Sequence, residues 1–184
     1  MEAPLGCTVW LTGLPCSGKS TIARMAREKL EQSGVPVELL DGDEIRRHFS
    51  AGVGFSKEER SNHLKKVAYL CHLLTKHGVV VLASFVSPYR QNREYARRLV
   101  GDRFIEVYTD STLEACMKRD VKGMYKKALA GEILQFTGVS DPYEPPEHPH
   151  LVLKTDGEPP EESLSKLLSL LRDRYGVPVP DQKG

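Results

Sequence analysis

The sequence has few cysteines, no long apolar run and no excess of charge of either sign. Among its 184 residues are four cysteines, 26 basic and 25 acidic residues. The cysteines are scattered without the close pairs of a zinc site, and no charged-then-apolar leader suggests secretion. A formal net charge of +1 gives no reason to expect a nucleic-acid partner. These absences favour a reduced, cytoplasmic globular protein.

Run length, hydrophobic share and chain length bear on membrane insertion, disorder and the number of domains. The longest run, residues 79–83, is far shorter than the ~20 residues that span a bilayer, so we expect no membrane segment. A hydrophobic share of 40% argues against disorder. The length suits one compact domain and is too short for two ordinary ones.

Strand-like and helix-like patterns alternate along the chain. Five short β-rich runs end in polar residues, at 7–12, 37–40, 79–83, 104–108 and 151–153. Helical patterns occupy residues 19–32, the stretch that follows a capping-box sequence at 56–59, and residues 164–175. This alternation predicts an α/β fold with a doubly wound, mainly parallel five-stranded sheet, which binds ligands at the carboxyl ends of its strands.

Residues 13–20, GLPCSGKS, fit the phosphate-binding pattern G-x-x-x-x-G-K-[ST] at every fixed position. In such a loop the backbone N–H groups and the helix N-terminus face the phosphates, Lys19 reaches the β and γ phosphates, and Ser20 ligates Mg²⁺. An ordinary glycine-rich turn is the alternative, but the strand before and the helix after the loop disfavour it. No Asn-Lys-x-Asp motif for guanine occurs, which favours ATP. The residues expected to bind ATP here are Gly13, Leu14, Pro15, Cys16, Ser17, Gly18, Lys19, Ser20 and Thr21.

Three further motifs place polar residues near this loop. In LLDGDEIRR an apolar strand ends in Asp41, a candidate for binding Mg²⁺ or taking a proton; an Asp-Gly turn is the simpler alternative. In GFSKEER, Phe55 and Arg60 suit a ligand with a base and an anion, although core packing and a solvated face would also explain them. In SFVSPYR, Ser87 follows the third strand, where a turn is the alternative.

Residues 119–149 are basic at first and then rich in glycine and proline. A connection of this length in a compact domain is usually functional, so we expect a lid that neutralises phosphate charge and excludes water. A surface helix followed by a plain connection is the alternative.

The combination of motifs resembles the adenylylsulfate kinase (APS kinase) family. It consists of WLTGLPCSGKST, LDGDEIR, GFSKEER, SFVSPYR, KGMYKKALAGEI, FTGVSDPYEPP and LVLKTD, in this order over residues 8 to 171. The resemblance implies transfer of the ATP γ-phosphate to the 3′-hydroxyl of adenosine 5′-phosphosulfate (APS), which yields 3′-phosphoadenosine 5′-phosphosulfate and ADP for sulfate activation. Another small-molecule or nucleoside P-loop kinase, or a non-catalytic nucleotide-binding module, stays open as the alternative.

The resemblance also implies roles for single residues. Lys19 and Asp41 would be catalytic, Ser20 and Asp41 would hold Mg²⁺, and Arg119 would lie beside the adenine of ATP. Ser87 stands at the family's phosphoserine position, but direct in-line transfer needs no carrier, so we expect it to bind substrate. Phe55 and Phe136 would hold the adenine of APS between them. The implied substrate-binding residues are Asp41, Asp43, Arg46, Phe55, Arg60, His63, Val86, Ser87, Lys122 and Phe136.

The sequence departs from the family's pattern at a few positions. His63 replaces a common asparagine, and its titration near neutral pH would make substrate binding depend on pH. Glu44 replaces the asparagine that usually follows DGD. Pro15 and Cys16 replace smaller residues in the phosphate loop, where the backbone does the binding.

The predicted kinase domain spans residues 1–176, with the lid at about 119–149, and residues 177–184 form a tail or linker. Members of this family can be fused to ATP sulfurylase. The sequence leaves open whether this chain is fused to, or associates with, ATP sulfurylase, and whether it forms a homodimer.

Overall fold

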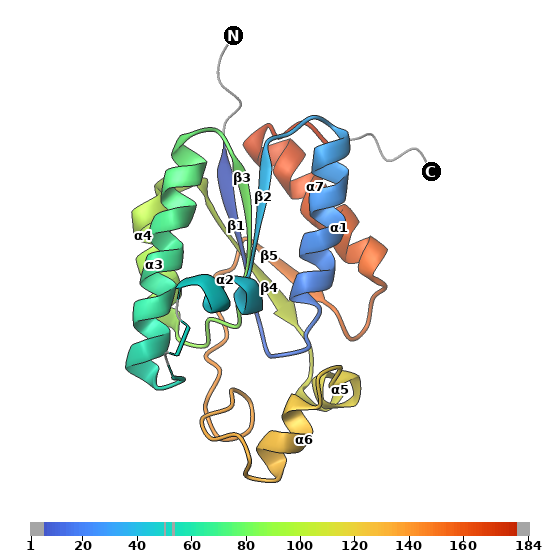
Figure 1. The fold of residues 1–184 in the computed structure, drawn as a ribbon. Helices are drawn as coiled ribbons and strands as arrows, with labels where there is room; N and C mark the ends of the chain where they lie inside the picture. Colours follow the sequence, from blue (N-terminus) through green and yellow to red (C-terminus); the bar gives the residue numbers. More distant parts are fainter. Residues whose placement is uncertain (1–5, 50, 53, 180–184) are drawn as a thin grey trace.

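The chain folds around one five-stranded parallel sheet (Figure 1). The computed structural model describes residues 6–49, 51–52 and 54–179. The strands are β1 (Cys7–Thr12), β2 (Val37–Asp41), β3 (Val80–Ser84), β4 (Phe104–Asp110) and β5 (Leu151–Lys154), in the spatial order β2-β3-β1-β4-β5. Each neighbouring pair is parallel. The predicted fold class and its five strands are confirmed.

Helices cover both faces of the sheet, as Figure 1 shows. One face carries α1 (Lys19–Gln32) and α7 (Pro160–Tyr175), and the other carries α3 (Lys57–Lys76) and α4 (Arg90–Val100). Shorter elements are α2 (Gly42–Phe49), α5 (Leu113–Arg119), α6 (Met124–Leu129) and the 3-10 turn η1 (Gly101–Arg103). Among the described residues, no helix combines the length and apolar character needed to cross a membrane.

The alternation of side chains along β1 explains why helices pack on both faces. Cys7, Val9 and Leu11 belong to the apolar cluster under α1 and α7. Trp10 points to the other face, where it stacks on Phe85 with the ring centroids 5.7 Å apart. Because both faces of the strand are buried, its sequence is almost continuously apolar.

Two of the predicted helix boundaries rest on local hydrogen bonds. The predicted capping box is confirmed at the start of α3, where the Ser56 side chain accepts from the Glu59 N–H and the Glu59 carboxylate accepts from the Ser56 N–H. At the end of α7, Gly176 adopts φ 66°, and the Val177 N–H donates to the Leu171 carbonyl at 3.1 Å. This is a Schellman-type ending that needs glycine for its left-handed backbone.

The predicted lid contains a helix and shares an apolar cluster with α5. Residues 119–149 include α6, and together with α5 they lie beyond the carboxyl ends of the strands (Figure 1). Tyr125 and Phe136 meet edge to face there, with centroids 5.0 Å apart. Leu14 and Cys16 of the phosphate loop pack against this lid cluster, which consists of Cys116, Tyr125, Ala128 and Phe136. The lid therefore rests on the phosphate loop itself.

The segment predicted as a tail begins with a core residue. Val177 is 3% exposed and packs with the residues under α1 and α7, and Val179 is partly buried against the same cluster. Residues 180–184 lie outside the described residues. The ending of α7 turns the chain back over the core, so the packed part of the structure extends past residue 176.

This packing predicts a measurable loss of stability for Val177→Ala. Removing two methyl groups from a buried position should cost about 2 kcal/mol of unfolding free energy. Val121, which is 87% exposed, offers the matched control, and Val121→Ala should change stability by less than about 0.5 kcal/mol. Urea unfolding of the three proteins gives the comparison. Equal stability of Val177→Ala and wild type would mean that Val177 contributes nothing to the core.

Candidate active site

The phosphate loop leaves β1 through a space that admits no side chain at Gly13. A Cβ at Gly13 would lie 2.3 Å from Thr109 Oγ1 and 2.6 Å from the Thr109 carbonyl oxygen. Ser17 Oγ lies 2.7 Å from Thr109 Oγ1, which in turn donates to the Thr12 carbonyl at 3.0 Å. The loop is thus fixed against the end of β4, and Gly18 with φ 93° leads it into α1. Both glycines of the motif are required by this geometry.

Lys19 lies in the first turn of α1 with its side chain folded over the loop. Its Nζ donates to the carbonyl oxygens of Gly13 at 3.0 Å and Leu14 at 2.7 Å. Burial lowers the pKa of Lys19 to about 8, with nearby acidic groups such as Asp41 opposing the shift. Lys19 therefore stays mainly protonated at pH 7 and presents a positive charge where phosphates would enter.

Three polar side chains meet beside the loop at the carboxyl edge of the sheet. In the pairing of β2 with β3, Asp41 lies opposite Ser84. The Ser20 hydroxyl donates to Asp41 Oδ2 at 2.8 Å and lies 3.2 Å from Ser84 Oγ. Asp41 Oδ1 accepts the N–H of Asp43 at 3.1 Å. The fold therefore brings the Ser20 hydroxyl at the start of α1 into contact with the Asp41 carboxylate at the end of β2, 21 residues later in the chain.

One cleft of about 1060 Å³ brings most of the predicted site residues together. Two predicted site residues do not line the cleft: Gly13 lies against β4, and Leu14 packs against the lid cluster. The predicted residues that do line the cleft are Pro15, Cys16, Ser17, Gly18, Lys19, Ser20, Thr21, Asp41, Asp43, Arg46, Phe55, Arg60, His63, Val86, Ser87, Arg119, Lys122 and Phe136.

The two aromatic rings predicted to hold an adenine have different surroundings. Phe55 is 50% exposed, and the guanidinium of Arg46 lies 4.0 Å from its ring centroid. Phe136 is largely buried and packs against Tyr125. Both rings line the cleft, and their adenine sandwich stays a prediction.

Arg60 connects α3 to the lid. Its Nε donates to the Phe55 carbonyl at 2.7 Å, its NH1 donates to Thr137 Oγ1 at 2.9 Å, and it forms an ion pair with Asp141 at 3.6 Å. With this many partners the side chain is mostly buried, so the alternative of a solvated Arg60 is wrong.

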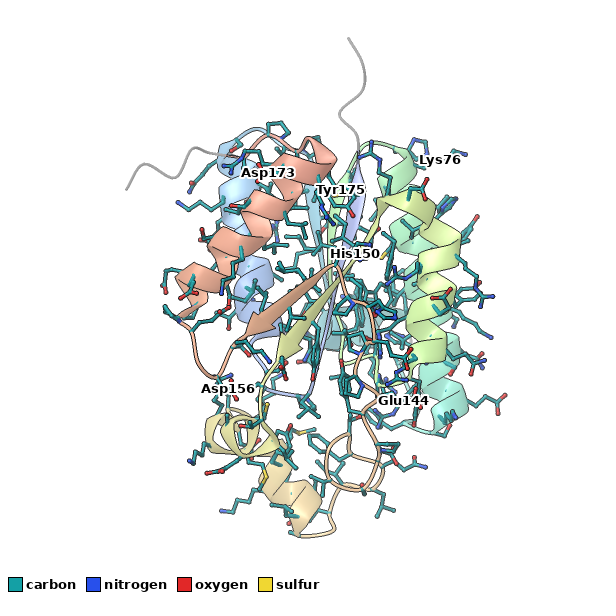
Figure 2. The ribbon with its side chains drawn as sticks, turned by 180° about the vertical axis from the view of Figure 1, so that it is seen from behind. Lys76, Glu144, His150, Asp156, Asp173 and Tyr175 are labelled. Atoms are coloured by element: carbon teal, nitrogen blue, oxygen red, sulfur yellow. The ribbon has the colours of Figure 1, made fainter. Side chains whose placement is uncertain are left out.

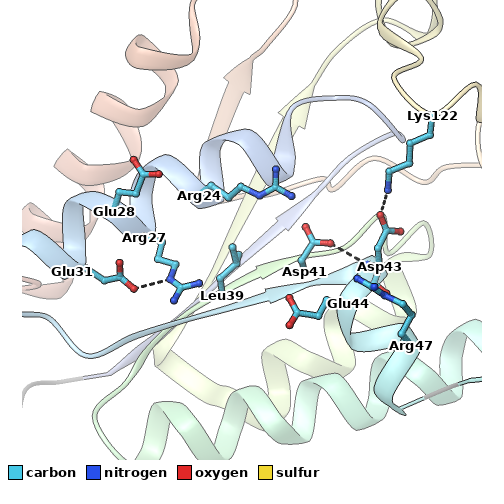
Figure 3. A pocket seen from close by; sticks show the side chains of 10 residues that line it. All are labelled: Arg24, Arg27, Glu28, Glu31, Leu39, Asp41, Asp43, Glu44, Arg47 and Lys122. Carbon is cyan, nitrogen blue, oxygen red and sulfur yellow. Dashed lines mark hydrogen bonds and ion pairs between the residues drawn. The ribbon is translucent and has the colours of Figure 1, made fainter.

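A pocket of about 600 Å³ adjoins the cleft at Asp41 and Asp43 (Figure 3). Lys122 of the lid forms an ion pair with Asp43 across this boundary. Glu44, one of the departures from the family's pattern, lines the same pocket. Two residues predicted to bind substrate therefore bind each other in this structure, one from α2 and one from the lid.

Ser87 is buried and has an unusual backbone. Its φ of 41° is left-handed, and its side chain is 3% exposed. Trp10 Nε1 donates to Ser87 Oγ at 3.0 Å, and Ser87 Oγ donates to Thr12 Oγ1 at 2.9 Å. The hydroxyl is thus already engaged by two residues of β1.

Thr155 is a cleft residue to which sequence reasoning assigned no role. Its Oγ1 donates to the Ser17 carbonyl at 2.7 Å, and its own carbonyl accepts from Arg119, which also reaches the Cys16 carbonyl at 3.4 Å. The signal that could have found Thr155 is its position just after the last strand, at the edge of the sheet where the phosphate loop lies.

Comparison with known proteins decides the family. Residues 5–154 match the adenylylsulphate kinase family. The chain belongs to this family.

Relatives and solved structures agree with this assignment. The chain is 47% identical to the adenylyl-sulfate kinase of Halothermothrix orenii over 181 residues, and this aligned region covers 98% of this chain and 97% of that protein. It is 49% identical over 171 residues to the adenylyl-sulfate kinase of Gloeothece citriformis, with 93% and 96% covered. The structure of the Mycobacterium tuberculosis APS kinase in complex with AMPPNP and APS superimposes with a TM-score of 0.88 at 39% identity, covering 92% of this chain and 99% of that one. As a member of this family, the chain is an ATP-dependent phosphotransferase with an alcohol acceptor.

His63, which departs from the pattern of this adenylylsulfate kinase family, is buried in the cleft wall. It is 5% exposed, and its ring centroid lies 6.0 Å from that of Phe85. Burial, helped by the positive charges of Arg46 and Lys66, lowers the pKa of His63 to about 4. The expectation that His63 titrates near neutral pH is wrong, because the folded protein keeps the ring neutral down to about pH 5.

This burial predicts a specific dependence of stability on pH. In the unfolded chain His63 takes up a proton near pH 6.5, whereas the folded chain resists protonation down to about pH 4. The contribution of His63 to stability is therefore retained above pH 6.5 and is lost as the pH falls from 6.5 toward 4. Between pH 7 and pH 5 the loss should be about 2 kcal/mol.

Urea unfolding at pH 7 and pH 5 measures this loss. His63→Asn should lose about 2 kcal/mol less than wild type over this range. His148→Asn, at an exposed position, should lose as much as wild type. Equal losses for wild type and His63→Asn would contradict the neutral, buried histidine.

Proposed function

We propose that the chain transfers the γ-phosphoryl group of ATP to the 3′-hydroxyl of adenosine 5′-phosphosulfate. The observation that carries this proposal is the single cleft that extends from Lys19 and Ser20 at the phosphate loop to Phe55 and Phe136. Its volume of about 1060 Å³ suits two nucleotides side by side, since sites for one small ligand usually measure ~300–1000 Å³. The M. tuberculosis APS kinase, with AMPPNP and APS bound together, supports the same arrangement.

The proposed reaction is a direct in-line displacement. A bond forms between the acceptor 3′-oxygen and the γ-phosphorus, the bond from that phosphorus to the β,γ-bridging oxygen breaks, and ADP leaves. The proton of the hydroxyl departs during the transfer, with Asp41 as the nearby acceptor. Lys19 places its charge on the β and γ phosphates, and the backbone of residues 13–18 binds their oxygens. The lid excludes water that would otherwise hydrolyse ATP.

We infer that Ser20 and Asp41 hold Mg²⁺. Their oxygens lie 2.8 Å apart at the entrance of the phosphate loop. Mg²⁺ prefers oxygen ligands and is usually held by one or two protein groups together with phosphates and water, so one hydroxyl and one carboxylate fit it. When bound, the ion would neutralise charge on the ATP phosphates.

ADP release tests the proposed substrate. A coupled assay with APS as acceptor should show rapid release of ADP, whereas adenosine monophosphate should give at most a small fraction of that rate. Lys19→Ala should lower the rate by about a hundredfold or more, because its charge stabilises the transferring phosphoryl group. Equal rates with both acceptors would reject APS as the specific substrate, and a wild-type rate in Lys19→Ala would remove the phosphate loop from the mechanism.

Ser87→Ala separates direct transfer from transfer through a phosphoserine. Because the Ser87 hydroxyl is buried and bonded to Trp10 and Thr12, we expect Ser87→Ala to keep more than about a tenth of the wild-type kcat. Single turnover of wild type with ATP alone should leave no phosphoserine. Loss of all transfer in Ser87→Ala, together with a trapped phosphoserine in wild type, would overturn direct transfer.

A further inference from the structure

Arg93 is a fully buried arginine on α4 that belongs to none of the predicted sites. It is 2% exposed, and its guanidinium donates in three directions. Nε donates to Glu106 Oε1 on β4 at 2.8 Å, NH1 to the Ser87 carbonyl at 2.6 Å, and NH2 to the Glu144 carbonyl at 2.6 Å. One side chain thus joins a core strand, a wall of the cleft and the segment that leaves the lid.

The Ser87 carbonyl belongs to a stretch of backbone that needs outside support. Ser87 has a left-handed φ of 41°, a conformation that a residue with a side chain holds only where its surroundings impose it. The preceding carbonyl, that of Val86, accepts from Thr12 Oγ1 at 2.9 Å. Arg93 and Thr12 therefore hold two consecutive carbonyls of the cleft wall, and both Val86 and Ser87 line the cleft.

The second carbonyl that Arg93 holds lies on the return segment, residues 143–150, which forms the end of the predicted lid and leads into β5. Figure 2 labels Glu144 near its start and His150 at its end. The Glu144 N–H donates to the Pro88 carbonyl at 2.8 Å, and the Glu144 carboxylate accepts the Arg90 N–H at 2.8 Å. The Arg93 guanidinium carbon lies over the Tyr143 ring, 5.7 Å from the ring centroid, and the Tyr143 hydroxyl is 2.9 Å from Thr12 Oγ1. The return segment and the wall around Ser87 form one hydrogen-bonded unit with Arg93 at its centre.

We propose that Arg93 is a positioning residue for the acceptor half of the cleft. The proposal rests on the proposed function, because it assigns the wall at Val86 and Ser87 to the phosphate acceptor. Arg93 fixes the backbone of that wall and holds it in register with the return segment of the lid. The planar fork of an arginine can reach three acceptors at once, and the single ammonium of a lysine cannot hold all three at these positions.

Core stability alone does not account for this arrangement. A buried ion pair is a weak source of stability, because the cost of desolvating both charges offsets their attraction, and apolar residues of similar volume often serve as well. Glu106 also has a second arginine, Arg97, whose NH2 lies 2.7 Å from Glu106 Oε2. Arg93 differs from Arg97 in its pair of bonds to the Ser87 and Glu144 carbonyls and in its burial, with 2% of its side chain exposed against 33% for Arg97.

This difference supplies a matched control on the same helix and the same carboxylate. Arg93→Lys keeps a charge beside Glu106 but loses the three-way fork, and Arg97→Lys makes the same change in the neighbour. In initial-rate kinetics, Arg93→Lys should raise the KM for APS by about tenfold or more, while the KM for ATP stays within about threefold. Arg97→Lys should leave both KM values within about threefold of wild type.

A double variant guards against a folding defect. Arg93→Gln with Glu106→Gln removes both charges of the buried pair. Arg97 also loses Glu106, but its side chain is 33% exposed and keeps Glu94 as an ion-pair partner at 3.7 Å. It should show the same selective rise in the KM for APS, with a cooperative thermal transition. An unchanged KM for APS in both Arg93 variants, equal rises for APS and ATP, or loss of the folded state in both variants would overturn the proposal.

Hydrogen exchange keeps this test separate from that of the proposed function. With no substrate present, the backbone amides of Val86, Ser87, Tyr89, Arg90, Tyr143 and Glu144 should exchange faster in Arg93→Lys than in Arg97→Lys. If wild type fails to use APS, the proposed function fails, whereas equal exchange in the two variants means that Arg93 does not hold the wall.

Discussion

Parallel pairing of β1 with both β3 and β4 is the constraint on which the active site depends. In this register Leu11 lies opposite Ser84 and Thr12 opposite Tyr108, so β1 and β3 end close to one level while β4 continues past them to Asp110. The phosphate loop then passes Thr109 with no room for a side chain at Gly13. A slip of one residue in either pairing would turn every side chain of the slipped strand to the other face and separate the loop from its partners.

The same edge of the sheet concentrates buried polar groups. Lys19, His63, Ser87 and Arg93 are all buried, and the positive charges of Lys19 and Arg93 are directed at carbonyl oxygens of loops. Buried polar groups need partners. Lys19 and Arg93 find backbone carbonyls of the phosphate loop and of the cleft wall, and Arg93 also pairs with Glu106. The Ser87 hydroxyl bonds with side chains of β1. The polar interior thereby fixes the shape of the cleft, while the two apolar clusters on the faces of the sheet supply the bulk of the stability.

The lid is attached to the kinase at both ends of its path. At its beginning, the Tyr125 hydroxyl donates to the Pro15 carbonyl at 2.9 Å, and the lid cluster packs against Leu14 and Cys16. At its end, the return segment is hydrogen-bonded to the wall around Ser87. Phe136 lies between these attachments. The loop that binds phosphate and the wall proposed for the acceptor are thus connected through one segment, so movement of the lid would affect both.

Local patterns in the sequence were sufficient for much of this description. Short β-rich runs predicted the five strands. Helix-forming and apolar patterns, with the Ser56–Glu59 capping box, predicted α1, α3 and α7, and motif spacing identified the phosphate loop. These features depend on residues that are close in the chain. Helix α4 was not predicted, because Asn92 and Arg93 occupy buried positions where an apolar residue would have shown the period. The protonation state of His63, the burial of the Ser87 hydroxyl, the packing of Val177 and the partners of Arg93 were decided only by the tertiary structure. Each depends on groups brought from distant parts of the chain, and the sequence records their identity but not their distance.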